Sequence, residues 1–307
     1  MKHAIVTGGS GFIGSWLVNE LIDNGINVCV IVREKDRLLP EIIQSKKVSI
    51  IEKKMNDICE LDFDSDIHYD VFFHLAWAGV SSNSKNDLLL QIENIKMSLH
   101  ALELCKGIGC DLFFAAGTVA EYGLCKGVID TNARQTPNDM YGAAKASLYY
   151  FLEVKARQLN QKFIWGIIPS TYGERRNDNN IITYTIRSLL LGEKPIYGDL
   201  KQMWDFLYVK DVAKAIRLIG EKGLSGKIYG IGSGIYKPLR EYVTIIRDLI
   251  NPSYLLGIGE VQALSTQTFS SCVDIDELKA DTGFEPSVSF VTGIRRTIDY
   301  QRGLLKV

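Results

Sequence analysis

Short apolar segments alternate with longer amphipathic segments along the first half of the chain. The apolar segments read AIVT, VCVIV, VSII, VFFHLA, LFFAA and FIWGIIP in order. Helical periodicity occupies residues 12–24, 87–106 and 141–160 between them. Strands that are apolar throughout are typical of a parallel sheet covered by helices on both faces. The pattern therefore predicts an α/β fold with a doubly wound parallel sheet.

The alternation of apolar and amphipathic segments ends after Pro169. The segment STYGERRNDNN is polar and predicts a loop, and LLGEKPIYGDLKQ is rich in turn residues. Strand-like DFLYV and IYGIG follow, with helices predicted from Asp211 and over residues 239–250 and 291–302. We predict a larger unit, residues 1–170 with about 205–233, and a smaller C-terminal α/β unit, residues 171–204 and 234–307.

Composition narrows the class of protein. The 307 residues are 46% hydrophobic and 23% charged, with a formal net charge of −1. This balance favours a globular protein without affinity for nucleic acid or membrane surfaces. No apolar run approaches the roughly 20 residues that span a bilayer, and the start of the chain lacks a secretion signal. The six cysteines show no CxxC spacing, so we expect reduced thiols, no metal site and a cytoplasmic location.

A glycine-rich turn follows the first predicted strand. VTGGSGFIG places Gly8, Gly9, Gly11 and Gly14 between that strand and the first predicted helix. Glycines in this context allow a tight turn and a close approach of backbone N–H groups to a pyrophosphate. The positive end of the helix dipole adds to the attraction for an anion. The turn predicts a dinucleotide-binding protein.

The second predicted strand ends without the acidic residue that commonly binds an adenosine ribose. Val32 and Arg33 stand there, with Lys35 and Arg37 close behind. A carboxylate accepts hydrogen bonds from ribose hydroxyls, whereas a guanidinium offers a planar set of donors that suits a 2′-phosphate. The absence of an acidic residue and the presence of Arg33 predict NADP in preference to NAD. The alternative is an ordinary basic loop exposed to solvent, which would have the same composition.

Tyr141 and Lys145 are one helical turn apart in MYGAAKAS, on one helix face. A neighbouring ammonium is expected to lower the pKa of a phenol, which is ordinarily about 10. Thr118, at the end of an earlier predicted strand, could hold a carbonyl or alkoxide oxygen beside that phenol. The three residues predict a site for acid–base chemistry at a carbonyl.

Together these motifs resemble the extended short-chain dehydrogenase/reductase family, which includes nucleotide-sugar epimerases, dehydratases and reductases. The resemblance rests on TGGSGFIG, HLA, Asn94, GTVAEYG and YGAAK, and on IIPSTYGE, DFLYVKDVAKAI and TGFEPSVSFVTGI further along. It covers nearly the whole chain. It implies a Rossmann domain, a substrate-binding C-terminal domain and a homodimer formed through the helices that carry Asn94 and Tyr141.

The resemblance also implies roles for individual residues. Tyr141 would be the catalytic acid–base, Lys145 would bind the nicotinamide ribose and tune the phenol, and Thr118 would orient the substrate oxygen. The implied cofactor contacts are Gly8, Gly11, Phe12, Ile13, Gly14, Asp57, Ile58, Leu75, Ala76, Asn94, Tyr141, Lys145 and Pro169, to which Arg33 and Arg37 are added for NADP. The predicted substrate contacts are Trp77, Thr118, Ser170 and Trp204.

Two departures from the family pattern bear on the reaction. Dehydratases of the family usually carry an Asp–Glu pair directly after the catalytic hydroxyl, but Val119 and Ala120 follow Thr118 here. Trp204 stands where many relatives have an arginine that meets the nucleotide phosphates. A replacement cation could come from Arg175, Arg176 or Lys201. Dehydration is therefore disfavoured, and the phosphate contact is left open.

The favoured hypothesis is an NADP(H)-dependent reductase of a nucleotide-linked 4-keto-6-deoxy sugar. The signatures GTVAEYG and WDFLYV resemble CDP-abequose synthase-like and dTDP-fucose-forming reductases. Three alternatives stay open: an NAD-dependent nucleotide-sugar 4-epimerase, a reductase of another ketone such as a flavonoid-type substrate, and a non-catalytic NADP-binding protein. The sequence leaves the sugar, the nucleotide and the attacked face of the ketone undetermined.

Overall fold

The computed structural model describes residues 1–80, 84–125, 127–176, 178–261 and 271–307. Its centre is a seven-stranded sheet in the order β12-β7-β5-β4-β1-β2-β3, in which every neighbouring pair is parallel. The strands are β1 His3–Thr7, β2 Asn27–Val32, β3 Val48–Glu52, β4 Val71–His74, β5 Leu112–Thr118, β7 Lys162–Ile168 and β12 Ile228–Gly230. The predicted parallel α/β sheet is confirmed.

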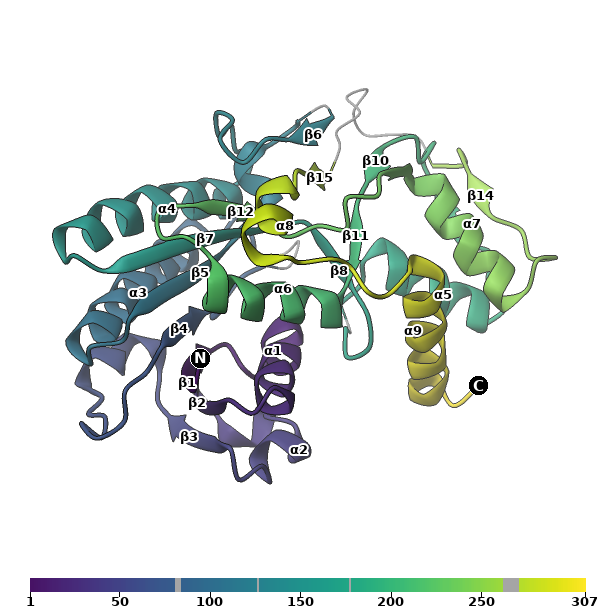
Figure 1. Ribbon diagram of the computed structural model, residues 1–307. Helices are drawn as coiled ribbons and strands as arrows, with labels where there is room; N and C mark the ends of the chain where they lie inside the picture. Colours follow the sequence, from purple (N-terminus) through teal and green to yellow (C-terminus); the bar gives the residue numbers. More distant parts are fainter. Residues whose placement is uncertain (81–83, 126, 177, 262–270) are drawn as a thin grey trace.

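Helices cover both faces of this sheet (Figure 1). On one face α1 (Phe12–Asp23) and α6 (Val209–Lys222) pack against each other. Their buried side chains, such as Leu17 and Ile216, join one apolar core with β1 and β2. On the other face α3 (Leu88–Gly107) and α4 (Met140–Gln158) form a second core with Phe113 and Trp165 of the sheet. Apolar side chains on both faces explain why these strands lack alternation.

Three further helices pack together at the right in Figure 1. A third core lies among α5 (Ile181–Leu190), α7 (Leu239–Ile250) and α9 (Phe290–Leu305). The short strands pair as β8 Ser170–Tyr172 with β11 Phe206–Tyr208, β9 Ile196–Tyr197 with β14 Gly257–Ile258, β10 Met203–Trp204 with β13 Lys237–Pro238, and β6 Val128–Ile129 with β15 Cys272–Val273.

Several short elements complete the fold. They are α2 (Pro40–Ile43), α8 (Asp276–Thr282) and the 3₁₀ turns η1 (Lys35–Arg37), η2 (Met55–Glu60) and η3 (Val119–Tyr122). Helix α8 packs against α6 and β12, so part of the C-terminal segment returns to the central sheet. The division into two domains with the predicted boundaries stays a prediction. Within the described residues, no helix combines the length and apolarity needed to cross a membrane.

Candidate active site

The glycine turn after β1 brings backbone close to backbone at two points. Gly8 has φ +77°, and a Cβ there would lie 2.8 Å from the backbone N of Ala76. A Cβ on Gly14 would lie 2.1 Å from the carbonyl oxygen of Gly8. Helix α1 begins after Gly11, which makes no side-chain cap to the first N–H groups. The turn therefore leaves uncapped helix N–H groups at the carboxyl edge of the sheet, which fits a dinucleotide pyrophosphate.

Two cavities meet at this turn. The first, here called the cationic cavity, has a volume of about 690 Å³, and its lining includes Arg33, Arg37, Lys53 and Lys54. The second, the tyrosine cavity, has a volume of about 440 Å³ and is lined in part by Thr118, Tyr141 and Lys145. Both cavities share Gly8, Gly11, Leu75 and Trp77. A single elongated ligand could therefore run from one cavity into the other over the glycine turn.

Most of the predicted cofactor residues line these two cavities. Leu75, Ala76 and Asn94 lie at the cationic cavity, and Phe12, Ile13, Gly14 and Pro169 lie at the tyrosine cavity. At the predicted adenine edge, Met55 and Asn56 line the cationic cavity. Asp57 is exposed and Ile58 is fully buried, and neither belongs to the lining. The 3₁₀ geometry of η2 places the neighbouring residues toward the cavity.

A buried hydrogen-bond chain fixes the loop that follows β4. The Asn94 side chain accepts from the Ala78 N–H and donates to the Ala78 carbonyl, both at 2.9 Å. His74 bridges Thr7 and Ser98, each at 2.9 Å, and Ser98 donates to the Asn94 carbonyl at 2.7 Å. Burial lowers the pKa of His74 to about 3, so the ring is neutral. The loop that carries Leu75, Ala76 and Trp77 is therefore held by neutral groups.

The sequence-distant residues Thr118 and Tyr141 are brought together by the start of α4. Asp139 caps the helix by accepting from the Gly142 N–H at 2.8 Å. A Cβ at position 142 would lie 2.3 Å from the Ala120 carbonyl oxygen, so the glycine permits close packing of α4 on η3. The Thr118 side chain lies within hydrogen-bonding reach of the Tyr141 phenol. The predicted hydroxyl and phenol therefore meet in the tyrosine cavity.

Lys145 lies in a largely apolar surrounding. Its ammonium donates to the Ala116 carbonyl at 2.7 Å and lies 3.8 Å from the centroid of the Trp77 ring. The indole N–H of Trp77 donates to Gln91 at 3.0 Å, which fixes the ring. Burial lowers the pKa of Lys145 to about 7. The structure thus places Trp77, which we predicted as a substrate contact, directly against this lysine.

The phenol of Tyr141 departs from the sequence-based expectation. Burial raises its pKa to about 12, and the negative charges of Glu121 and Asp139 add to the rise against the opposing hydrogen bond from Thr118. The expected lowering by the Lys145 ammonium is not found in this arrangement, in which burial has the largest effect on the phenol. Tyr141 is therefore fully protonated near neutral pH, which makes it a proton donor.

Glu121 is a buried residue of this region that the sequence reasoning missed. Its carboxylate accepts from the Thr118 N–H at 2.7 Å, from Gln135 at 2.8 Å and from the Trp165 indole at 3.2 Å. The Thr118 hydroxyl in turn accepts from the Ala120 N–H at 3.3 Å, which completes a capping box around η3. The T-x-x-E spacing of Thr118 and Glu121 is the sequence signal that could have predicted this role of Glu121 in a capping box.

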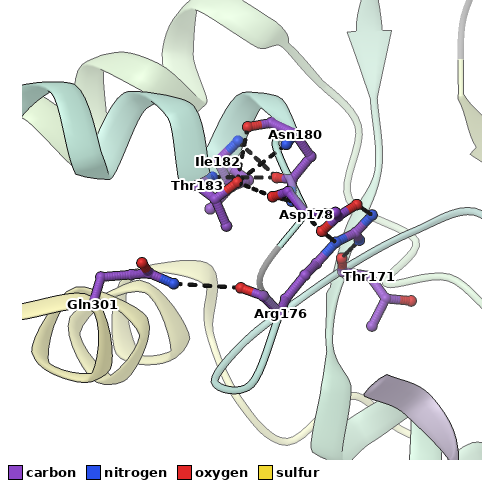
Figure 2. Close-up of polar contacts among 7 residues, drawn as sticks. All are labelled: Thr171, Arg176, Asp178, Asn180, Ile182, Thr183 and Gln301. Carbon is purple, nitrogen blue, oxygen red and sulfur yellow. Dashed lines mark hydrogen bonds and ion pairs between the residues drawn. The ribbon is translucent and has the colours of Figure 1, made fainter. Parts of the chain in front are cut away.

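The predicted substrate contacts lie in two places: Trp77 and Thr118 line the tyrosine cavity, whereas Ser170 and Trp204 do not. Ser170 and Trp204 bond to each other at 2.6 Å, outside the lining of both cavities. Of the three candidate replacement cations, Arg176 lines the tyrosine cavity and pairs with Asp178 at 2.7 and 2.9 Å (Figure 2). Arg175 instead pairs with Glu41, and Lys201 pairs with Asp199. The predicted roles of Ser170 and Trp204 stay predictions.

The sheet order, the glycine turn and the Thr–Tyr–Lys group define a nucleotide-cofactor enzyme of the extended short-chain dehydrogenase/reductase type. A model of the NAD dependent epimerase/dehydratase family matches residues 4–232, and the chain belongs to that family. The predicted family and the predicted enzyme type are confirmed.

Three similar proteins show the range of this family. The chain is 26% identical to the dTDP-glucose 4,6-dehydratase of Haemophilus influenzae, with 98% of each chain covered. It is 25% identical to the dTDP-4-dehydro-6-deoxyglucose reductase of Escherichia coli, with 96% of each covered. The solved UDP-glucose 4-epimerase of Thermotoga maritima superposes with a TM-score of 0.84 at 26% identity, with 99% of each covered. The comparisons thus place the chain among enzymes that modify nucleotide sugars.

Proposed function

We propose that this protein is an NADP(H)-dependent reductase of a nucleotide-linked 4-keto-6-deoxy sugar. The observation that carries the proposal is Arg33, directly after β2 and in the lining of the cationic cavity. At the end of β2, a carboxylate would bind the hydroxyls of an unphosphorylated ribose. This chain has the guanidinium of Arg33 there instead. A net consumer of reducing equivalents fits the phosphorylated cofactor better than an enzyme that regenerates its cofactor in each cycle.

The buried position of Glu121 argues against dehydration. A dehydratase needs a carboxyl group that removes a proton from the sugar, and Val119 and Ala120 supply none. Glu121 is the nearest acid in sequence, but its side chain is fully buried and accepts three hydrogen bonds from the surrounding fold. Because it would have to give up these donors to reach a substrate, the similarity to dehydratases does not carry their reaction to this chain.

The residues of the tyrosine cavity can complete a ketone reduction. When bound, the reduced nicotinamide would supply the hydride that adds to the ketone carbon. Tyr141 donates its phenolic proton to the oxygen of the same carbonyl, and hydride and proton together convert the ketone into a secondary alcohol. Thr118 orients that oxygen through its hydroxyl. Lys145 would hold the nicotinamide ribose, and Gly8, Gly11 and Gly14 would admit the pyrophosphate.

An NAD-dependent nucleotide-sugar 4-epimerase is the second candidate. Glu34 also lines the cationic cavity, one residue beyond Arg33, and could accept hydrogen bonds from an unphosphorylated ribose. In the structure its carboxylate pairs with Arg37 at 2.9 Å, which leaves Arg33 as the stronger contact for a phosphate. The family description as NAD dependent supports this candidate as well.

One experiment separates the two candidates. The purified protein is titrated with NADPH and NADH, and cofactor oxidation is then followed with a panel of nucleotide-linked 4-keto-6-deoxy sugars. The reductase predicts tighter binding of NADPH and one NADPH oxidised per ketone reduced. Interconversion of two nucleotide sugars at constant NAD, by a protein that purifies with cofactor attached, would replace the reductase by the epimerase.

We also propose that the protein is a homodimer through α3 and α4. These two helices pack against each other and carry large exposed apolar side chains. Ile92 of α3 is 50% exposed, and Tyr150 and Phe151 of α4 are each 55% exposed. A monomeric mass by light scattering, at the concentrations used for assays, would contradict this assembly.

A further inference from the structure

Glu121 lies behind Thr118, outside the lining of the tyrosine cavity, and it is unusual because its fully buried carboxylate accepts hydrogen bonds from neutral donors only. Those donors come from three segments: the Thr118 backbone, the Gln135 side chain and the Trp165 indole. Among the described residues no cation makes a direct ion pair with it. A buried charge without a paired ion is costly unless an opposite charge lies nearby.

Lys145 supplies that opposite charge. Its ammonium is also buried with neutral contacts only, the Ala116 carbonyl and the Trp77 ring. The Trp165 ring neighbours both residues: its centroid is 5.9 Å from the Lys145 ammonium, and its N–H donates to Glu121 at 3.2 Å. Each charge is therefore the partner that keeps the other ionised in a medium of low dielectric constant.

The backbone between these residues is built to hold Glu121 behind the catalytic hydroxyl. Ala116, Gly117 and Thr118 are consecutive: the first binds Lys145, and the third carries the hydroxyl beside Tyr141. A Cβ at Gly117 would lie 2.2 Å from the Trp165 indole nitrogen and 2.7 Å from the Glu121 carboxylate. Any side chain at position 117 would therefore displace the Glu121–Trp165 pair.

We propose that Glu121 is a positioning residue of the catalytic group, which fixes Thr118 through its backbone and keeps Lys145 in the ammonium form. This role rests on the proposed acid–base function of Tyr141 and Lys145, and it holds for a reductase or an epimerase alike. The pKa directions agree: burial raises the pKa of Glu121 to about 7, and the Lys145 charge opposes that rise. Among the described residues, Glu121 is the group that raises the pKa of Lys145, and loss of its carboxylate removes that influence.

Other ionisable groups surround this pair and must be weighed in a pH profile. His74 lies near Lys145 and is neutral, with its pKa lowered to about 3. Tyr141, Tyr122 and Tyr149 face Glu121, and each has a raised pKa. Asp139 acts on Tyr141 from the start of α4. Since these phenols and this imidazole do not titrate between pH 6 and 9, a change in that range reports on Lys145 and Glu121.

The test compares Glu121→Gln with the wild type in the pH dependence of kcat from pH 5.5 to 9. Without the carboxylate, Lys145 loses its proton at lower pH. The fall of kcat on the alkaline side of the pH profile should therefore begin about one pH unit lower. At pH 8 kcat should then fall about tenfold, and at pH 6 it should stay within about threefold of the wild type. Glu103→Gln, which removes the same charge from the surface of α3, is the matched control and should leave the profile in place.

Two further measurements test the proposal if the sugar substrate is wrong or if the first variant does not fold. Binding of NADPH or NADH across the same pH range needs no turnover, so it reads the Lys145 charge even if the proposed sugar substrate is wrong. If Glu121→Gln does not fold, Gln135→Leu removes one donor to the carboxylate and should shift the alkaline fall of kcat in the same direction by a smaller amount. An unshifted fall in a folded variant, with kcat lowered equally at every pH, would make Glu121 a purely structural residue.

Discussion

The cationic cavity and the tyrosine cavity share the glycine turn but use their residues in opposite ways. In the first, charged side chains are exposed to solvent: the Arg37 side chain is 56% exposed even within its ion pair. In the second, Lys145 is 6% and Thr118 is 9% exposed. Exposed cations suit the binding of a phosphate, whereas buried groups acquire the shifted pKa values that acid–base chemistry needs. Under the proposed function, burial separates the residues for recognition from those for reaction.

The largest expected effect lies in the tyrosine cavity. Tyr141→Phe removes the proton donor and leaves the ring, so kcat should fall by about 10² to 10⁴. The Kd for NADPH should change by less than about threefold, since the glycine turn and Arg33 are untouched. Tyr300→Phe, which deletes a hydroxyl from α9 outside the lining of both cavities, should leave steady-state turnover unaltered. Near-normal turnover by Tyr141→Phe would refute the assignment of the donor.

A smaller loss is expected where the two cavities meet. Gly14→Ala places a Cβ 2.1 Å from the Gly8 carbonyl oxygen, so the turn must shift. Backbone displacement of this kind costs about 1–3 kcal/mol, and it should weaken both NADPH and NADH by up to about 100-fold. Isothermal titration of both cofactors measures this. Gly107→Ala, where a Cβ meets open space, is the control, and unchanged binding by Gly14→Ala would argue against pyrophosphate at the turn.

The smallest effect, and the most selective, is expected in the cationic cavity. Arg33→Ala removes hydrogen bonds to a charged phosphate, so the Kd for NADPH should rise about tenfold while that for NADH moves by less than about twofold. Lys35→Ala removes an equal charge from a residue outside the cavity lining and should change neither. Equal losses for both cofactors would return Arg33 to an ordinary surface role and favour the epimerase.

Much of the fold was predictable because it depends on local patterns. The apolar strands and the helices at 87–106 and 141–160 appear in the structure as β1–β5, β7, α3 and α4, with ends shifted by one or two residues. Helices α2, α5 and α8 were missed. Helix α5 does carry a start signal, since Asn180 caps its first N–H groups and Ile182, Ile186 and Leu189 follow at helical spacing. It was overlooked because the polar loop before it and the turn-rich segment after it dominate this part of the sequence.

The candidate site was predictable to the extent that its residues form motifs. Tyr141 and Lys145 are one helical turn apart and the glycines lie in one turn, and the structure brings both groups together with Thr118 at the same edge of the sheet. Arg176 was one of three equivalent cations in the sequence, and only the tertiary structure places its guanidinium over the Phe12 ring of the glycine turn. Glu121 was missed, although its T-x-x-E spacing from Thr118 is visible in the sequence.

The sequence by itself determined the parallel α/β fold, the glycine turn and the identity of the hydroxyl, phenol and ammonium, because these depend on residue type and on spacing within single elements. Only the tertiary structure decided their charge states. Burial keeps Tyr141 protonated, holds the pKa of Lys145 near 7 and sets Glu121 behind Thr118. The physical reason is that desolvation and long-range electrostatic partners arise when β5, α4 and β7 pack together, and no local spacing encodes that packing.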